Sequence, residues 1–562
     1  MFDAIVVGSG MSGGWVAKEL TEKGFKTLII ERGRHIEHGV DYTDNLAPWE
    51  LPDANRVPED EVRRDYPVQS TCYAFNAATK QYWVKDSEHP YSTPADKPFH
   101  WIRGYHLGGR SLMWGRQSYR WSELDFAANG RDGHGSDWPI RYADLAPWYD
   151  HVERFAGIAG SREGIPQLPD GEFLPPMALN ACEADFKAKV EAAFPERRVI
   201  PSRTANLTEV KPQHEAVGRS RCQYRWFCDR GCSFGAYFSS LSATLPAARN
   251  TGNLTIVTDA IAQRLVYDPK SKRVTGVEVI DAKTRAGRTY EGRVVFLCAS
   301  TIPTAMILLN SKSEAFPNGL ANSSDMVGRN LMDHVSGGAA ATVIYPGLED
   351  RYYHGRRPTG FTVPRYRNVR QEEDYLRGYM LGGFAWRPNW TAGLTGQGGV
   401  GAQAKARLRK PGPWTLLVGA TVEMLPNPQN RVTLHPTRTD KWGMPIAHIE
   451  WAPGENERKL TAAARADVKA MVEAAGAEIV HLSGGDDPLS GSIHEMGTAH
   501  MGMDPKTSVL NKYGQAHDVG NLFITDGSAM ASSGTQNPSL TYMALSARGA
   551  HHAAEFLKAG RI

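Results

Sequence analysis

An apolar strand, a glycine-rich turn, a helix and a second strand follow one another in FDAIVVGSGMSGGWVAKELTEKGFKTLIIERG, directly after Met1. Gly8, Gly10 and Gly13 form the pattern GxGxxG inside this segment. The first glycine permits a tight turn, the second lets the backbone approach a pyrophosphate, and the third lets the helix pack closely on the strand. The helix predicted over about 13–23 points its positive N-terminal end at the phosphates. The segment therefore predicts a Rossmann-like dinucleotide-binding domain.

Glu31 strengthens this prediction because it follows the second strand, which is predicted over 27–30. An acidic side chain at that position accepts hydrogen bonds from the adenosine ribose of a dinucleotide. Since strand, turn, helix, second strand and terminal acid all coincide, a glycine turn of an unrelated α/β protein explains the segment less well. These residues do not distinguish FAD from NAD.

The C-terminal segment NLFITDGSAMASSGTQNPSLTYMALSARGAHHAAEFL (521–557) combines a short strand, an Asp-Gly pair, a loop and a final helix. Pro538 is expected one or two residues into this helix, which is predicted to continue to about Lys558. Proline is well tolerated there because its missing N–H would have no partner within the helix. The helix N-terminus carries partial positive charge, so it would stabilise an anionic group in front of it.

The two ends of the chain resemble the glucose-methanol-choline family of flavoprotein oxidoreductases. Members of that family begin with this FAD fingerprint and end with a strand, Asp-Gly, a loop and Asn-Pro before the last helix. GGRSLMWG (108–115), VVFLCASTIPTAMILLNS (294–311) and VGRNLMDH (327–334) resemble further family segments. The resemblance implies an α/β fold: a Rossmann-like FAD-binding domain interleaved with an α+β substrate domain built on an antiparallel sheet. The residues expected to bind FAD are Gly8, Gly10, Gly13, Glu31, Gly109, Arg110, Ser111, Trp114, Ile261, Asp526 and Pro538.

One position departs from part of the family. Some of its sugar oxidases attach FAD covalently through a histidine at the place that Met113 occupies here. Methionine does not form that link, so the resemblance implies FAD held non-covalently. The final helix, aimed at the pyrimidine edge of the flavin, would stabilise its anionic reduced form.

Two histidines occur in SIHEMGTAHMG (492–502). By resemblance, His494, followed by a Gly-Thr pair, is the base that takes the proton of the substrate hydroxyl. Its expected partner is Asn537, which orients the hydroxyl without competing for the proton. Neutral histidine suits this task because its pKa lies near neutral pH. His500 is expected to be packed in the core.

Cys222, Cys228 and Cys232 stand within RCQYRWFCDRGCSFGAY (221–237), half of the six cysteines of the chain. A disulfide would leave one thiol over, and structural zinc needs a fourth ligand, for which His214 is near in sequence. Three thiolates also suit a 3Fe–4S cluster, in which each iron takes one protein ligand. The remaining Cys72, Cys182 and Cys298 are expected to be ordinary buried thiols.

The spacing of these three cysteines resembles that of the catalytic subunits of bacterial FAD-dependent glucose dehydrogenases and glucoside 3-dehydrogenases. That resemblance favours the 3Fe–4S cluster beside the flavin. It implies a dehydrogenase that passes electrons singly to a cytochrome c-type acceptor rather than to NAD or oxygen. A docking surface near Tyr224, Trp226 and Phe227 would follow, although these aromatic rings also suit simple packing around the cluster.

The expected FAD-binding domain is discontinuous, and the expected substrate domain fills one of its interruptions. A strand at about 254–258 and the two segments after it are expected to form a β-meander, and a helix is expected over about 455–476. The glycine-rich stretch 393–401 is a candidate mobile loop. The predicted boundaries are 1–165, 215–335 and 494–562 for the FAD-binding domain, 336–493 for the substrate domain, and 221–235 for the iron–sulfur loop.

The resemblance implies oxidation of the C3 hydroxyl of glucosides or disaccharides to 3-keto sugars. Oxidation of glucose at C1, or of gluconate, is the alternative; a sugar oxidase with structural zinc and a flavin lyase are less favoured. The net charge of +3 gives no reason to expect a nucleic-acid partner. No transmembrane segment and no signal peptide are evident, so a periplasmic location would need a small escort subunit that carries the export signal; the alternative is the cytoplasm.

Overall fold

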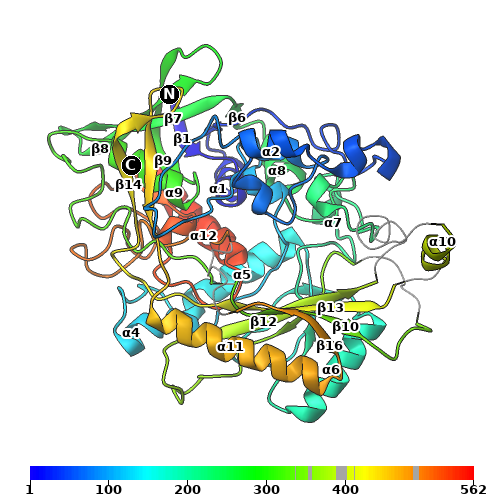
Figure 1. The fold of residues 1–562 in the computed structure, drawn as a ribbon. Coiled ribbons are helices and arrows are strands. Elements are labelled where there is room, and N and C mark those ends of the chain that lie inside the picture. The colour runs from blue at the N-terminus through cyan, green and yellow to red at the C-terminus, as the bar shows by residue number, and fades with distance from the viewer. Residues whose placement is uncertain (336, 352–356, 388–400, 410–411, 485–492, 562) are drawn as a thin grey trace.

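The computed structural model describes residues 1–335, 337–351, 357–387, 401–409, 412–484 and 493–561 (Figure 1). The predicted mobile loop at 393–401 lies outside these residues except for Gly401. Two sheets dominate the structure, one in the upper and one in the lower half of Figure 1, with the helices α5 (Tyr142–Ala156) and α12 (Ser539–Lys558) between them in this view.

The first sheet has seven strands, and the N-terminal glycine motif directly follows one of them. Its strands β1 (Phe2–Val7) and β2 (Thr27–Ile30) are parallel neighbours, and β1 also pairs in parallel with β9 (Gly287–Leu297). The paired parts of these strands, residues 4–7, 28–30 and 294–297, are apolar and buried, as expected where helices cover a parallel sheet on both faces. The helix α1 (Met11–Glu22) connects β1 to β2 and lies against α12. The sheet order is β6-β2-β1-β9-β8-β7, with β17 (Leu522–Ile524) paired in parallel with β9.

The predicted meander is correct for two of the three segments assigned to it. β7 (Ala260–Asp268) and β8 (Arg273–Asp281) are antiparallel neighbours, and β8 continues antiparallel to β9. The strand expected at 254–258 is β6 (Leu254–Val257), which instead extends the parallel sheet beside β2. Its assignment to the meander was wrong because its partner is more than two hundred residues away in sequence.

The second sheet is antiparallel, with the order β16-β10-β13-β12-β11-β5. Buried and half-buried residues alternate along β10 (Ala340–Tyr345), which is the pattern of a sheet with one face against the core. The helices α11 (Glu455–Ala474) and α6 (Ala181–Ala193) pack against it. The other strands are β5 (Ile200–Pro201), β11 (Phe361–Val363), β12 (Tyr379–Trp386), β13 (Trp414–Val422) and β16 (Glu478–Leu482).

The second sheet includes a strand from outside the predicted boundaries of the substrate domain, 336–493. β5 and α6 come from the stretch before residue 215, which the sequence left unassigned. In the other direction, the hairpin of β14 (Arg431–Thr439) and β15 (Pro445–Glu450) packs on α9 (Thr301–Asn310), beside the first sheet.

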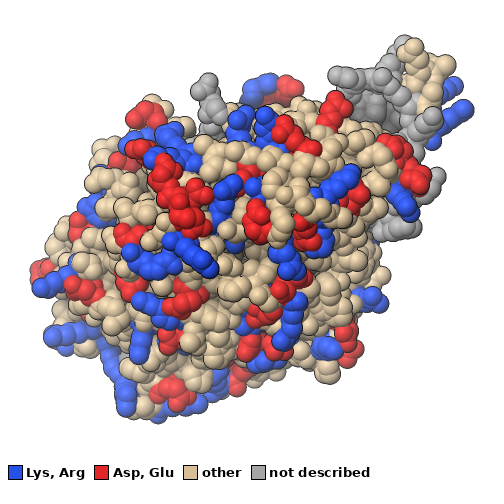
Figure 2. All heavy atoms as spheres, turned by 90° about the horizontal axis from the view of Figure 1, so that it is seen from below, with Lys and Arg blue, Asp and Glu red and all other residues tan. Residues whose placement is uncertain are grey.

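Among the described residues, no helix is both long enough and apolar enough to span a membrane. Figure 2 shows one face of the molecule, on which acidic and basic side chains are intermixed rather than gathered into patches of one sign.

Candidate active site

One elongated cavity brings together segments from both ends of the chain. It runs from the glycine turn after β1 to the N-terminus of α12. Of the residues predicted to bind a cofactor or substrate, only Gly13 and Pro538 do not line it: Gly13 packs behind the turn and Pro538 directly precedes α12. The predicted residues that line the cavity are Gly8, Gly10, Glu31, Gly109, Arg110, Ser111, Trp114, Ile261, His494, Asp526 and Asn537.

The three glycines of the turn fit the roles that the sequence assigns to them. Gly8 has φ +95°, and a Cβ atom there would collide with the backbone carbonyl of Cys298. A Cβ atom on Gly13 would collide with the carbonyl oxygen of Gly8, because helix and strand are closely packed. Gly10 differs: its nearest neighbour would be the carbonyl oxygen of Gly108, at 3.9 Å. The space in front of Gly10 is therefore open toward the cavity, where a pyrophosphate would lie.

Glu31 lies in the cavity wall with its carboxylate held by the turn. Its Oε2 accepts hydrogen bonds from the backbone N–H and the hydroxyl of Ser9, at 3.1 and 2.5 Å, and its Oε1 accepts from the N–H of Gly33 at 2.8 Å. Burial raises the pKa of this carboxyl, and these donors oppose the rise. Ser9 also accepts a hydrogen bond from the N–H of Gly108 at 2.8 Å, so the turn and the segment 108–115 are fixed to each other.

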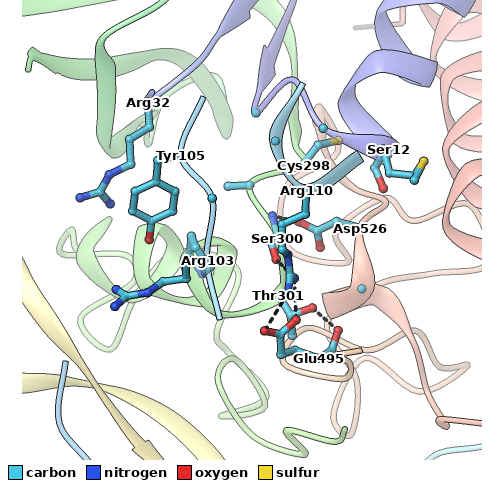
Figure 3. A pocket seen from close by; sticks show the side chains of 18 of the residues that line it. Ser12, Arg32, Arg103, Tyr105, Arg110, Cys298, Ser300, Thr301, Glu495 and Asp526 are labelled. Atoms are coloured by element: carbon cyan, nitrogen blue, oxygen red, sulfur yellow. Dashed lines mark hydrogen bonds and ion pairs between the residues drawn. The ribbon is translucent and has the colours of Figure 1, made fainter. Parts of the chain in front are cut away.

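Arg110 connects the segment 108–115 to Glu495, which directly follows His494 in the sequence (Figure 3). Its guanidinium donates to Glu495 at 2.6 Å and to the hydroxyl of Ser300 at 3.2 Å. The hydroxyl of Thr301 donates to the backbone carbonyl of Glu495 at 2.5 Å. The sequence did not identify Glu495, although a carboxylate directly after the expected base is a signal for a nearby cation.

His494 and Asn537 lie together, as predicted, and the structure adds His334 to them. The Nδ1 atoms of the two histidines are 2.9 Å apart, and the amide nitrogen of Asn537 is 3.2 Å from Nε2 of His494. Nε2 of His334 is 3.0 Å from the carbonyl oxygens of both Ser533 and Gly534. Carbonyl oxygens only accept, so Nε2 of His334 carries its proton.

The tautomer of His494 follows from that of His334. With its proton on Nε2, neutral His334 accepts at Nδ1, and therefore His494 donates from its own Nδ1. Nε2 of His494 is then the unprotonated nitrogen and faces the amide of Asn537. Burial lowers the pKa of His494 well below its usual value, and the positive charge of Arg110, like that of a protonated His334, lowers it further. His494 is therefore a neutral base at neutral pH.

Asp333 holds the backbone of both histidines in place. Its carboxylate accepts from the N–H groups of His494 and His334, each at 2.8 Å, and from the N–H of Ile493 at 3.2 Å. The motif VGRNLMDH contains Asp333 and His334, so the signal was present, but the sequence alone did not reveal their role. His500 lies outside the cavity and is buried, with Nε2 2.9 Å from the carbonyl oxygen of Thr507.

Cys222, Cys228 and Cys232 line one small second cavity, which we call the cysteine cavity. All six cysteines of the chain have free thiols, and no group of three or more His, Cys, Asp or Glu side chains among the described residues is arranged to hold a single metal ion. His214 is not a fourth ligand, because its ring nitrogens are occupied by the N–H of Lys211 and the carbonyl of Arg154, each at 3.1 Å.

The other cysteines are only partly as expected. Cys182 and Cys298 are buried, whereas Cys72 is half-buried, so the expectation that all three are buried was wrong for Cys72. The aromatic residues of the loop are half-buried, and Trp226 packs edge-on against Phe384 with their ring centres 5.8 Å apart.

Comparison with known proteins agrees with this geometry. Sequence models of GMC oxidoreductases match residues 2–336 and 426–546. The chain is 26% identical to the fructose dehydrogenase large subunit of Gluconobacter japonicus, over 99% of this chain and 98% of that protein. It is 28% identical to the 2-methyl-1,2-propanediol dehydrogenase of Mycolicibacterium austroafricanum, over 97% and 94%. A formate oxidase variant of Aspergillus oryzae RIB40 has the same fold, with a TM-score of 0.62 at 15% identity, over 100% and 98% of the two chains. The chain therefore belongs to the glucose-methanol-choline (GMC) oxidoreductases, FAD-dependent enzymes that oxidise CH–OH groups.

Proposed function

We propose that this protein is an FAD-dependent dehydrogenase that oxidises a secondary hydroxyl of a sugar, at C3 of a glucoside or disaccharide, to a ketone. The observation that carries the proposal is the unprotonated Nε2 of His494, which lies with Asn537 in the same cavity as the glycine turn. A base that removes a hydroxyl proton must be neutral and close to the reacting alcohol, and the tautomer of His494 meets the first condition.

The cavity fits FAD on the residues that line it. The turn leaves open space at Gly10, Glu31 lies where a ribose binds, and the backbone N-terminus of α12 faces the opposite end. When bound, FAD supplies the acceptor for the hydride of the substrate C–H bond. Nε2 of His494 takes the hydroxyl proton, while the amide of Asn537 orients the oxygen. His334 holds the proton of His494 on Nδ1 throughout.

The substrate class rests on resemblance and on the relatives. Both curated relatives described above are named as dehydrogenases, one of fructose and one of a diol. The position C3 comes from the likeness of the segments 103–122 and 221–237 to glucoside 3-dehydrogenases. Glucose C1 and gluconate oxidation differ from it only in which hydroxyl is presented to His494.

A panel of sugars tests the substrate. Purified enzyme is incubated with an artificial dye acceptor and glucose, gluconate, methyl glucosides, sucrose and trehalose, and NMR locates the new carbonyl. A ketone at C3 of the glucosides supports the proposal. Turnover confined to C1 of glucose or to gluconate rejects the C3 assignment. Peroxide production in air without dye indicates an oxidase, and a flavin that no substrate bleaches indicates a lyase.

We propose that electrons leave through a 3Fe–4S cluster held by Cys222, Cys228 and Cys232. The three thiols share one cavity, and Asn206, also in its wall, is 1% exposed; its side-chain N–H₂ has no oxygen acceptor among the described residues and lies at the sulfur of Cys222. A buried donor beside thiols suits a sulfur acceptor. In such a cluster each thiolate binds a different iron, so the sulfurs need not converge on one point as they would for zinc.

Iron and acid-labile sulfide in protein purified without oxygen test the cluster. About three irons and four sulfides per chain, with an EPR signal in the oxidised state, support it. Zinc, or neither metal, rejects it.

The proposed acceptor is a cytochrome c-type protein. Large apolar side chains are exposed in the segment 221–237, which we call the cysteine loop, and in a segment that contacts it: Phe234 in the loop is 37% exposed, and Trp49 in the segment 40–50 is 86% exposed. The segment 40–50 is joined to the loop by the hydrogen bond from Thr43 N–H to the carbonyl of Arg230 and by the ion pair of Arg225 with Asp44. An acceptor docked there would lie close to the cysteines.

We further propose that a small escort subunit exports the folded chain to the periplasm. The support is the resemblance, and the relative from Gluconobacter japonicus is named as a large subunit. Cell fractionation of the chain expressed with and without a candidate small subunit tests this. Enzyme that remains in the cytoplasm in both cases rejects export.

A further inference from the structure

Two buried arginines beside the cysteine cavity lack a carboxylate partner. Of the nine arginines that are buried, six form ion pairs with carboxylates, and only Arg116, Arg219 and Arg548 do not, among the residues described. A buried charge is costly unless another charge compensates it. The six paired residues are Arg103, Arg120, Arg197, Arg203, Arg365 and Arg377.

Arg219 lies beneath the C-terminal end of the cysteine loop. Its Nε donates to the carbonyl of Gly235 at 2.9 Å and Nη1 donates to the carbonyl of Ala156 at 2.8 Å, while the buried Nη2 has no hydrogen-bond partner in the described part of the chain. The N–H of Gly235 in turn donates to the carbonyl of Cys232 at 2.8 Å. Burial lowers the pKa of Arg219 to about 9, and the charge of Cys232 opposes this.

Arg116 lies between the two cavities. Arg116 lines the cavity that contains the glycine turn and His494, which we call the FAD cavity. Its Nη1 donates to the carbonyl of Trp114 at 2.7 Å. Burial lowers its pKa, but the charge of Cys228 is the first of several that raise it, and the net direction is upward. The backbone places Arg116 near a second cysteine, Cys222: the carbonyl of Arg116 accepts from the N–H of Ala205 at 2.9 Å, and two residues after Ala205 the carbonyl of Leu207 accepts from the N–H of Cys222 at 2.8 Å.

These arginines require an anion that the described side chains do not provide. Three thiolates around an iron–sulfur core would carry net negative charge. Arg116 would face this charge near Cys228, and Arg219 would face it near Cys232. We infer that Arg116 and Arg219 are the counter-charges of the cysteine-held centre and raise its reduction potential, and that Arg116 does the same for the flavin. This inference rests on the proposed function.

Arg116 and Arg219 are expected to differ in which redox centre they affect. A positive charge favours the more negative, reduced form of any centre near it. Arg219 is not part of the FAD cavity wall, so its removal should affect the cysteine-held centre alone. Arg116 belongs to the FAD cavity wall and interacts with Cys228, so its removal should affect both centres.

Potentiometric titration of the holoenzyme tests this, with EPR for the centre and visible absorbance for the flavin. In Arg219→Gln we expect the equilibrium constant for one-electron reduction of the centre to fall about tenfold, equivalent to about 59 mV, with the flavin unchanged. In Arg116→Gln we expect both potentials to fall. Arg116→Lys and Arg219→Lys keep the charge and should restore the potentials. Arg548→Gln is the matched control, because this buried arginine also lacks a carboxylate but lines neither cavity.

The outcomes distinguish this inference from the proposal beneath it. Wild-type protein without iron overturns the electron route and this inference with it. Wild-type protein that holds the cluster, combined with unchanged potentials in both Gln variants, overturns this inference alone. If the Gln variants lose the cluster while the Lys variants keep it, the requirement for charge is supported. If the Lys variants also lose it, charge is not what the site requires, and the inference fails.

Discussion

The surroundings of His494 and those of the three cysteines differ in how fully the protein satisfies its own polar groups. Around His494, the ring nitrogens of His334, the carboxylate of Asp333 and the guanidinium of Arg110 all have partners from the chain. Around the cysteines, an N–H group of each of Arg116 and Arg219 is buried without a partner, and the side-chain N–H₂ of Asn206 has no oxygen acceptor, among the described residues.

This difference indicates two kinds of site. The alcohol site is preorganised: its protons are already placed, and a substrate enters without rearrangement of the base. The cysteine cavity has the polar groups of a site whose remaining member is not protein. The alcohol site should lose activity when one hydrogen-bonded side chain around His494 is removed. The cysteine cavity should lose its function when the group that the cysteines hold is lost.

The largest effect is expected at the base. His494→Ala should lower kcat by about 10³-fold, because a positioned general base contributes 10²–10⁴. FAD content should stay at the wild-type level, since the glycine turn is untouched. Stopped-flow reduction of the flavin by substrate measures the effect. His134→Ala, on the exposed surface, is the control; wild-type rates in His494→Ala would refute the assignment of the base.

Loss of one cysteine should affect the group held in the cysteine cavity and leave the alcohol site unchanged. In Cys228→Ser we expect the iron content to fall below one atom per chain and one-electron acceptors to be reduced at least tenfold more slowly, because a serine oxygen is a poor ligand for iron. Reduction of the flavin by substrate should continue. Cys72→Ser, outside the cysteine cavity, should keep its iron. A Cys228→Ser variant that retains full iron would show that the cysteines are not the ligands.

A smaller effect is expected when the tautomer of the base is released. His334→Ala removes the acceptor for Nδ1–H of His494 and should lower kcat about 10²-fold. The loss of the His334 ring also opens space beside His494, and because burial is the main cause of the low pKa of His494, water in that space should raise this pKa. Since the base works only when unprotonated, activity lost on the acid side should then be lost at higher pH than in the wild type.

His334→Asn provides the matched variant, because its side-chain oxygen can occupy the place of Nδ1 and accept the same hydrogen bond. We expect it to recover part of the rate and of the pH profile. A loss of rate in both variants without any change in the pH profile would indicate that His334 supports the structure and does not set the tautomer.

The sequence predicted best what is local. The strand, turn and helix from β1 to β2 and the start of α12 follow from patterns of neighbouring residues, and α11 begins at Glu455 as expected. β6 was misassigned, and α6 and β5 were left without a place, because their partners lie far away along the chain.

The same limit applies to the site. His494 and Asn537 were found from motifs, but the role of His334 depends on a contact across 160 residues and on two carbonyls near residue 533. Arg116 and Arg219 gave no sequence signal, since what distinguishes them is burial without a carboxylate. Fold and base are thus readable from pattern, whereas proton placement and charge balance require the packed structure.

The smallest effects are expected at the glycine turn, where two substitutions separate fold from cofactor. Gly13→Ala places a methyl group against the carbonyl of Gly8 and should lower the free energy of unfolding by about 1–3 kcal/mol. Gly10→Ala meets only the carbonyl of Gly108, at 3.9 Å, so stability of the FAD-free protein should be unchanged. Its methyl group enters the space expected for the pyrophosphate, so FAD affinity should fall about tenfold. Urea unfolding of the FAD-free protein and fluorescence titration with FAD measure the two effects. Equal FAD affinity in wild type and Gly10→Ala would mean that the pyrophosphate does not lie at this turn.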